Sequence, residues 1–465
     1  MKRNAEVMRM TEGTPWKCIL LFSLPLMIGN LFQQLYNTVD SIVVGNYIGK
    51  EALAAVGSVD PIISTFIGFF SGLSAGAGVV ISQYFGAKQD RNVSESVHST
   101  VAITLLLSVV LTVLSQLLTP AFLEMLGTPD DVWPEASRYL RIYFMGVTGQ
   151  LIYNMGAGIL RAVGDSRRPL FFLIFSALTN TILDIIFVAI LRFGVEGAAY
   201  ATIISQALSA ILVAAILLRE RGSFRIEIRK IRIYPERAVK IIRIGMPTAL
   251  QMMITSFSNV FIQSYINHFG SAAMAGWSSY SKIDKFCLLP LQSIGLGITT
   301  FAGQNLGAGK IERTNRGIKD ATLMNFITAV VLIIILWVLA PQLVYLFNKD
   351  EDVIYYGTLF LRTISPFFIC NSFNLIHNGA LKGAGNTKIP MIVTMSCFIA
   401  FRQAYLFVVS RLTDSIYAVA MGYPLGWLLN AIILAIYYRH IDLGKYVITG
   451  RTGTKSLNHQ GSSPS

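Results

Sequence analysis

Apolar stretches alternate with short polar segments along the whole chain. Most of these stretches reach about 20 residues or more, the length that a helix needs to cross the hydrocarbon core of a bilayer. The pattern predicts twelve transmembrane helices, at approximately 17–44, 52–83, 96–119, 136–160, 169–191, 195–218, 241–267, 272–304, 318–346, 353–380, 389–410 and 414–438. The predicted fold class is therefore all-α and integral to a membrane.

The polar segments between these helices alternate in charge. Acidic residues gather in 120–135 and 347–352. Basic residues gather in the N-terminal segment, the C-terminal tail, 84–95, 161–168, 219–243, 305–317 and 382–388. Because basic loops remain in the cytoplasm, we expect both termini to be cytoplasmic, in a multi-pass protein of the plasma membrane.

The composition agrees with a membrane protein. The chain has 465 residues, of which 53% are hydrophobic and 14% are charged, whereas a soluble protein carries about 25% charged residues. The net charge of +13 follows from the basic cytoplasmic segments. It therefore gives little support to the alternative that segment 219–243 binds nucleic acid.

The two halves of the chain resemble each other. GILRAVGDSRRP at 158–169 matches GALKGAGNTKIP at 379–390, and QYFGAK at 83–88 matches QNLGAG at 304–309, both at the same offset along the chain. Six helices per half predict two parallel, pseudo-symmetric six-helix lobes around a central cavity, which is a transporter architecture. The predicted domains are the first lobe at 1–218, a basic linker at 219–240, the second lobe at 241–440 and a polar cytoplasmic tail at 441–465.

Small residues in the second predicted helix indicate close helix packing. Gly68, Gly72 and Gly76 recur every four residues. Small residues at this spacing let two helix backbones approach each other inside a membrane. We interpret these glycines as packing positions, in preference to a functional role.

Signatures of enzymes and bound cofactors are not found in the sequence. The stretch GQNLGAGKI at 303–311 lacks the glycine and the Ser/Thr that a phosphate-binding loop requires. The four cysteines have no spacing typical of a metal site or a disulfide framework. We therefore expect no enzymatic activity, no direct use of ATP and no cofactor.

Polar residues inside the predicted first lobe form a candidate ion site. Asp40 and Asp184 are acids within apolar helices, where charged residues usually mark ion or substrate pathways. With a helical rise of about 1.5 Å per residue, Asp40, Asp184 and Thr202 reach similar depths of roughly 10–14 Å from the outer ends of their helices. Helical spacing places further polar residues on the same helix faces: Asn30, Gln33 and Asn37 with Asp40, Asn180 with Asp184, and Gln206 with Thr202.

This group is suited to two kinds of cation. Two buried carboxylates at one depth could hold a proton, or the oxygens of Asp40, Asn180, Asp184 and Thr202 could coordinate Na⁺. The sequence leaves both open. A purely structural polar network is the third alternative, which we disfavour because the lobe offers these acids no basic partner.

The second lobe has a different set of polar residues. The seventh and tenth predicted helices carry amides and a hydroxyl where the first lobe has acids: Gln251, Thr255, Asn259, Gln263, Asn371 and Asn374. Arg402 falls near the counterpart of Asp184 in the repeat. Lys282, Asp284 and Lys285 could pair among themselves or extend along the helix. We therefore expect ion coupling to belong to the first lobe.

The sequence resembles the multidrug and toxic compound extrusion (MATE) family. The resemblance rests on NLFQQLYNTVDSIVVG at 30–45, the QYFGAK and QNLGAG segments and the GILRAVGDSRRP/GALKGAGNTKIP pair. It implies a cation-coupled antiporter that exports organic, often cationic, drugs by a rocker-switch movement of two lobes. It also implies a proton or sodium site at Asp40, Asn180, Asp184, Thr202 and Asn37.

The same resemblance suggests that a substrate cavity is lined by Gln33, Tyr36, Asn37 and Asn154. We add three amides of the second lobe, which are Gln251, Asn259 and Asn374. One branch of the family carries acids in the seventh and tenth helices, which this chain lacks, so a sodium site in the second lobe is doubtful. The expected partners are drug-like small molecules and the lipid bilayer, with the protein working as a monomer. The alternatives are a flippase for a lipid-linked precursor and a non-transporting membrane receptor.

Overall fold

The first half of the chain folds into long helices. In the computed structural model of the protein, residues 9–447 are described, except for the side chains at 41, 50–54, 257, 259–261 and 263. The elements of the first half are α1 (Pro15–Tyr47), α2 (Lys50–Gly86), α3 (Asp90–Met125), α4 (Trp133–Met145), α5 (Val147–Ala162), α6 (Arg167–Asp184), the π-helical turn η1 (Ile185–Ile190) and α7 (Gly194–Arg219).

The second half repeats this order. A 3₁₀ turn in the linker, η2 (Ile228–Lys230), comes before it. The elements are α8 (Pro235–Asn267), α9 (Ser271–Gly307), α10 (Ile311–Tyr345), α11 (Glu351–Ile364), the 3₁₀ turn η3 (Ser365–Phe367), α12 (Phe368–Gly383), α13 (Lys388–Met395), the π-helical turn η4 (Ser396–Phe401), α14 (Arg402–Leu412), α15 (Ile416–Ala420), α16 (Gly422–His440) and the 3₁₀ turn η5 (Leu443–Tyr446).

The structure confirms the predicted all-α membrane fold. Ten helical segments of the described chain are long and apolar enough to cross a bilayer. The predicted helix 136–160 is instead two shorter helices, α4 and α5, that meet at Gly146. The remaining predicted helix, 241–267, is the continuous helix α8, which lies outside those ten segments because it is less apolar.

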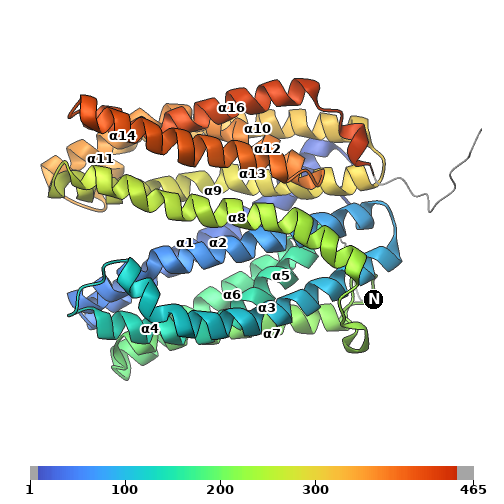
Figure 1. Cartoon of the computed structure of the whole chain (residues 1–465), viewed down its shortest axis with the longest axis horizontal. Coiled ribbons are helices and arrows are strands. Elements are labelled where there is room, and N and C mark those ends of the chain that lie inside the picture. Colours follow the sequence, from blue (N-terminus) through green and yellow to red (C-terminus); the bar gives the residue numbers. More distant parts are fainter. Residues whose placement is uncertain (1–8, 448–465) are drawn as a thin grey trace, which may run out of the picture.

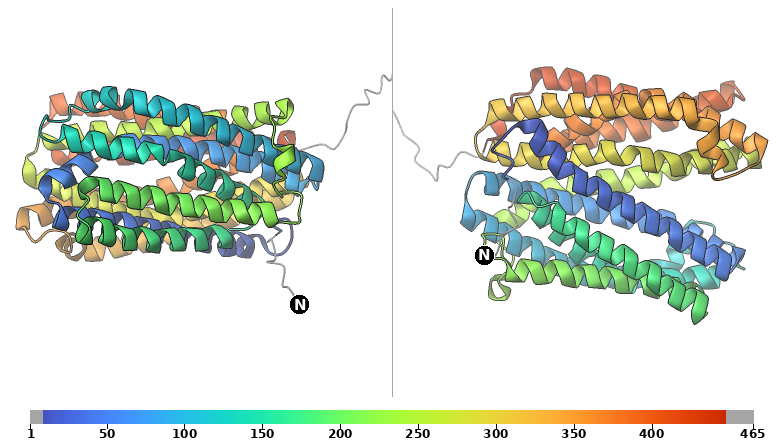
Figure 2. Two further views of the ribbon diagram at one scale, coloured as in Figure 1. Left: turned by 90° about the horizontal axis from the view of Figure 1, so that it is seen from below. Right: turned by 180° about the vertical axis from the view of Figure 1, so that it is seen from behind.

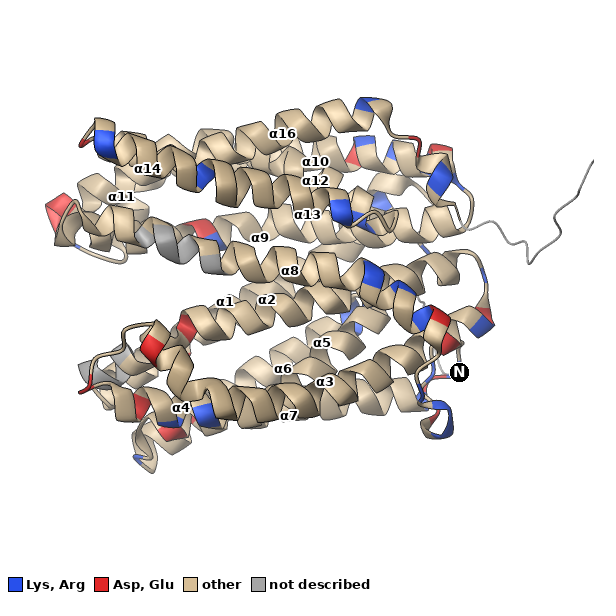
Figure 3. Ribbon diagram, viewed as in Figure 1, with Lys and Arg blue, Asp and Glu red and all other residues tan. Residues whose placement is uncertain are grey.

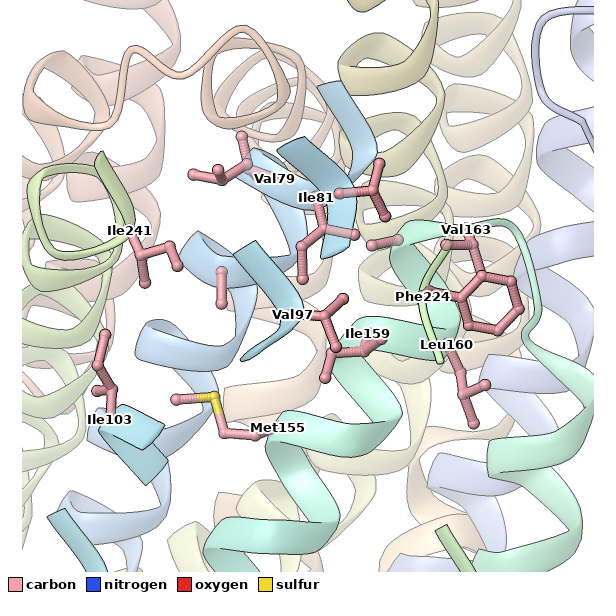
Figure 4. Close-up of a cluster of buried hydrophobic side chains, with 14 of the residues drawn as sticks. Val79, Ile81, Val97, Ile103, Met155, Ile159, Leu160, Val163, Phe224 and Ile241 are labelled. Carbon is pink, nitrogen blue, oxygen red and sulfur yellow. The ribbon is translucent and has the colours of Figure 1, made fainter. Parts of the chain in front are cut away.

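The helices form two lobes that lie side by side (Figure 1). Most of α1–α7 lies in one lobe and most of α8–α16 in the other, and the view from behind shows the same division (Figure 2, right). The first lobe has a core in which Val79, Val97 and Ile159 come from three helices (Figure 4). Phe224 of the linker is buried in the same core. The linker is thus packed against the first lobe.

The first helix of each half begins against the other half. Met10 and Ile19, at the start of the first half, share a buried cluster with Ile298 and Phe301 of α9. In the same way, Ile241 near the start of α8 is buried in the core of the first lobe. The two lobes therefore hold each other at this end of the bundle, which also carries the linker and is called the linker end below.

The predicted role of the glycines in α2 is confirmed, because they face the backbone of α8. A Cβ atom added to Gly76 would lie 2.1 Å from the Cα of Gly245, and one added to Gly72 would lie 2.4 Å from the Cα of Ala249. Gly68 is less tight, with the backbone of Met252 at 3.3 Å. The contact thus becomes closer toward the linker end of α2.

Charged residues of the described chain gather at the two ends of the bundle, and most of the ribbon between them carries none (Figure 3). At the linker end, the guanidinium of Arg237 donates hydrogen bonds to Glu95, Tyr84 and Asn92 of the first lobe. This distribution is typical of helices whose middle parts lie in hydrocarbon. Exceptions within the apolar helices include Asp40, Asp184, Asp284 and Arg402.

Candidate functional site

Asp184 is fully buried at a change of helix geometry. It is the last residue of α6, and the π-helical turn η1 begins at the next residue. Its side chain is 0% exposed, and neither carboxylate oxygen has a hydrogen-bond partner among the described residues. π-Helical turns within α-helices frequently occur at functional sites. A buried carboxylate without a donor is costly unless a cation neutralises it.

Asn180 and Thr202 lie beside this acid. Asn180 is one turn before Asp184 on α6, and its Nδ2 donates to the Oγ1 of Thr202 on α7 at 3.5 Å. Thr202 in turn donates to the carbonyl oxygen of Ala198 at 3.0 Å. The Oδ1 atom of Asn180 is buried and has no hydrogen-bond partner within residues 9–447. The nitrogen of the amide is therefore occupied by Thr202, and its oxygen is left to accept another ligand.

Asp40 approaches the same place from α1. Because α1 packs against α6 and η1, the carboxylate of Asp40 lies within electrostatic range of Asp184, and both carboxylates lie within range of the hydroxyl of Tyr36. The Oδ1 of Asp40 is also buried without a hydrogen-bond partner in the described part of the chain. Asn37, one turn earlier on α1, is exposed. The structure thus brings together Asp40, Asp184, Asn180 and Thr202, four of the five residues for which the sequence predicts a cation site, and leaves the fifth, Asn37, exposed.

Tyr139 of α4 borders this group, and the sequence interpretation missed it and its neighbour Tyr143. Tyr139 and Tyr143 are buried and stacked, with ring centroids 6.4 Å apart. Asp40 and Asp184 both lie within electrostatic range of the hydroxyl of Tyr139. Tyr143 donates from its hydroxyl to the Oε1 of Gln150 at 2.8 Å. The predicted helix 136–160 contains them, but a tyrosine in an apolar stretch gives no signal that distinguishes it from a core residue.

The residues predicted to line a substrate cavity fall into two groups. In the first lobe, Gln33 is hydrogen-bonded to Tyr36 on α1, and Asn154 donates to the carbonyl oxygen of Gln150 at 2.9 Å. In the second lobe, the Nε2 of Gln251 donates to the Oγ1 of Thr394 at 3.0 Å, and the Nδ2 of Asn374 donates to the carbonyl oxygen of Trp427 at 2.8 Å. The side chains of Asn259 and Gln263 lie outside the described residues. The two amides of the second lobe therefore join helices within that lobe.

The second lobe carries its own polar group. Arg402 is 3% exposed, and its Nη2 donates to the Oγ of Ser258 at 2.7 Å. Its guanidinium lies 4.8 Å from the ring centroid of Tyr423. Asp284 is hydrogen-bonded to Tyr280 on its own helix and, like Arg402, acts electrostatically on Tyr423. Lys282 and Lys285 beside it are exposed.

The two lobes differ in the charged residue beside their π-helical turns. Arg402 directly follows the π-helical turn η4, as Asp184 directly precedes η1. The first lobe places an acid at this turn and the second lobe a base. The described residues contain no group of three or more His, Cys, Asp and Glu side chains that could hold a metal ion. The first-lobe group combines carboxylate, amide and hydroxyl oxygens, which suit a proton or a hard monovalent cation.

Known proteins share both the sequence pattern and the fold. The family model MatE matches this chain twice, at 25–186 and at 247–406, once in each half. The probable multidrug resistance protein YoeA of Bacillus subtilis is 29% identical over 93% of this chain and 95% of its own length. The multidrug export protein MepA of Staphylococcus aureus is 23% identical over 83% of this chain and 85% of its own length.

Solved structures extend this similarity to the arrangement of the helices. A multidrug resistance MATE family transporter described in an outward-facing conformation has a TM-score of 0.87 with this chain, at 26% identity, and the match covers 94% of this chain and 98% of the other. A MATE structure in complex with MaL6 has a TM-score of 0.88 at 26% identity, with the same coverage. The two-lobe arrangement of this chain is therefore that of these transporters.

Proposed function

Because this chain belongs to the multidrug and toxic compound extrusion family, we propose that it exports organic, often cationic, small molecules in exchange for a proton or a sodium ion. The relatives named as multidrug resistance and export proteins support the substrate class. The observation that carries the exchange is the buried group of Asp184, Asp40 and Asn180. Four of its oxygens have no hydrogen-bond partner in the described chain.

The proposed coupling step follows from the free-energy cost of burying these oxygens without hydrogen-bond partners. A buried carboxylate is stabilised when a cation binds to it, so the group attracts a proton or Na⁺ whenever it is accessible. The same negative charge attracts an organic cation. Binding of the inorganic cation at Asp40 and Asp184 cancels that charge, and the organic cation is released. The two ligands therefore exclude each other, which is the requirement for exchange.

Alternating access is the second part of the proposal. The basic segments beside the linker end favour a cytoplasmic location for that end. The lobes are in contact at the linker end, so with this orientation the conformation described is closed toward the cytoplasm. In the proposed cycle, the cation-loaded protein rocks its lobes to open the linker end, releases the cation and binds substrate. It then returns to the conformation described.

Proteoliposomes that contain the protein and a trapped fluorescent organic cation, ethidium, test this function. We expect ethidium efflux under a pH gradient alone or under a Na⁺ gradient alone, and the gradient that drives it identifies the coupling ion. If neither gradient drives transport of ethidium or of other organic cations, antiport is wrong. Movement of a labelled lipid-linked precursor would instead support a flippase. A receptor would transport neither.

A further inference from the structure

A pair of equivalent hydrogen bonds joins the two lobes at the linker end. The Nε2 of Gln83 on α2 donates to the carbonyl oxygen of Gly383 at 3.0 Å. The Nε2 of Gln304 on α9 donates to the carbonyl oxygen of Ala162 at 2.8 Å. The donors begin the matching segments QYFGAK and QNLGAG, and the acceptors occupy equivalent positions in GILRAVGDSRRP and GALKGAGNTKIP. The same bond is thus made twice, once from each lobe to the other.

Glycines let the backbones meet beside these glutamines. A Cβ atom added to Gly86 would lie 1.9 Å from the carbonyl oxygen of Gln304, and one added to Gly307 would lie 2.0 Å from that of Gln83. These two glycines also occupy equivalent positions in QYFGAK and QNLGAG. The close approach is a backbone contact, which no change of side-chain rotamer can relieve. Any side chain at either glycine would therefore push the lobes apart.

The N-terminal segment adds a third contact on one side only. The backbone N–H of Met10 donates to the Oε1 of Gln304 at 3.1 Å, and the Nδ2 of Asn305 donates to the carbonyl oxygen of Met10 at 3.1 Å. Arg313 holds the same segment by donating to the carbonyl oxygen of Glu12 at 2.7 Å. Gln304 therefore makes two contacts with the first half of the chain.

We propose that Gln83 and Gln304 form a gate that closes the linker end and must open in each transport cycle. This proposal rests on the proposed function, since only alternating access requires the end to open. Both glutamines are buried, with 3% and 1% of their surfaces exposed. Each bond is an amide-to-carbonyl contact of modest net strength. Two such bonds stabilise the closed conformation and still permit it to open. Hydrogen bonds also fix how the two lobes are aligned, which a purely apolar contact of the same area would do less well.

The distance between the lobes at this end tests the gate directly. Spin labels are attached at Lys88 and Glu312, which are exposed on opposite lobes beside the gate, in a background without the four native cysteines. Pulsed electron paramagnetic resonance in nanodiscs then reports the closed and open populations. Gln83→Met removes the amide and keeps the length of the side chain. We expect it to shift the open-to-closed ratio by roughly fivefold, the value of one net hydrogen bond.

The proposed gate leads to two further expectations for the open-to-closed ratio. Gln304→Met is expected to shift the ratio more than Gln83→Met, because it also removes the contact with Met10. Gly86→Ala is expected to favour the open population although both glutamines are intact. Gln83→Asn, which keeps the amide but shortens its reach, should reproduce the shift if Gln83→Met does not fold.

Matched controls come from within one lobe. Gln116 donates from Nε2 to the carbonyl oxygen of Arg141 at 2.6 Å, and both residues belong to the first lobe, so Gln116→Met should leave the distances unchanged. Gly57→Ala, on the same helix as Gly86 but with no neighbouring atom within 4 Å, should do the same. Wild-type distances in a folded Gln83→Met/Gln304→Met double variant would overturn the proposal. This readout needs no transport, so a failure of the proposed function would appear in the ethidium assay and not here.

Discussion

Asn180 and Thr202, on two different helices of the first lobe, are joined by a hydrogen bond of 3.5 Å from Nδ2 to Oγ1. This bond fixes the orientation of the amide. Its nitrogen faces α7, and its oxygen remains buried, one helical turn before Asp184 on the same helix, without a hydrogen-bond partner in residues 9–447. Thr202 thus positions an oxygen of the proposed cation site, besides offering one of its own.

Thr202→Val is expected to separate the two candidate cations. Valine has the same shape but has no oxygen, so a sodium ion would lose one ligand and the fixed orientation of another. A proton held by a carboxylate needs neither. We therefore expect Na⁺-driven ethidium efflux to fall by roughly tenfold, the effect typical of a lost supporting partner at an ion site, and proton-driven efflux to change little.

Thr255 of the second lobe provides the control for this substitution. Like Thr202, it donates its hydroxyl to a carbonyl oxygen four residues earlier on its own helix, that of Gln251, at 2.7 Å. Thr255→Val therefore removes a comparable bond in the other lobe and should leave efflux under both gradients unchanged. Equal losses in the two variants would show that the effect of Thr202→Val is not specific to the cation site.

Asp184→Asn is expected to abolish export and to leave the protein folded. The neutral amide has nearly the same shape as the carboxylate, but it cannot carry the charge for which the proposed ligands compete. Efflux in proteoliposomes should fall to the level of empty liposomes, and the thermal unfolding midpoint should not decrease, because the buried charge without a partner is removed. Asp40→Asn should behave in the same way.

Asp284→Asn is the comparison for these variants. Asp284 also lies within a membrane helix, but in the second lobe and hydrogen-bonded to Tyr280. We expect its substitution to preserve the response of efflux to the driving gradient. Wild-type efflux by Asp184→Asn, or complete loss of coupling in Asp284→Asn, would contradict the placement of the cation site in the first lobe.

Local signals in the sequence were enough to predict most of the helices and to single out the acids within the helices of the first lobe. An acid in an apolar helix, such as Asp184, is conspicuous. Asn180 lies one helical turn before it, so the two residues are on one face of α6. The division of the predicted helix 136–160 at Gly146 was not predictable in this way, since the hydrophobic pattern continues through the break. The position of Tyr139 near both acids depends on this packing of α4.

The contacts between the lobes show a second limit of sequence interpretation. The repeated segments QYFGAK and QNLGAG were evident as a repeat, but their roles were not. Gln83 and Gln304 each bind a carbonyl group of the other lobe. That partnership depends on how the lobes are placed in space. A glutamine near the end of a helix, three residues before a glycine, carries no signal for it.

Arg402→Ala is expected to destabilise the second lobe without changing the coupling ion. The substitution removes the charged hydrogen bond to Ser258 and the contact with the ring of Tyr423, and it leaves space where the buried side chain was. Hydrogen bonds that involve a charged group contribute about 1.5–3 kcal/mol. The thermal unfolding midpoint should fall by several degrees, while the gradient that drives ethidium efflux stays the same. A new dependence on Na⁺ in this variant would instead show that Arg402 occupies a second cation site.

Gly76→Ala is expected to destabilise the contact between α2 and α8. The added methyl group would lie 2.1 Å from the Cα of Gly245, and because this neighbour is backbone, relief requires the helices to separate. Forcing an extra methyl into a tight contact costs about 1–3 kcal/mol, so the unfolding midpoint in detergent should decrease. Gly57→Ala has open space around it and gains helix propensity, so its midpoint should stay equal or rise. The same midpoint for both variants would mean that α2 and α8 do not pack through Gly76.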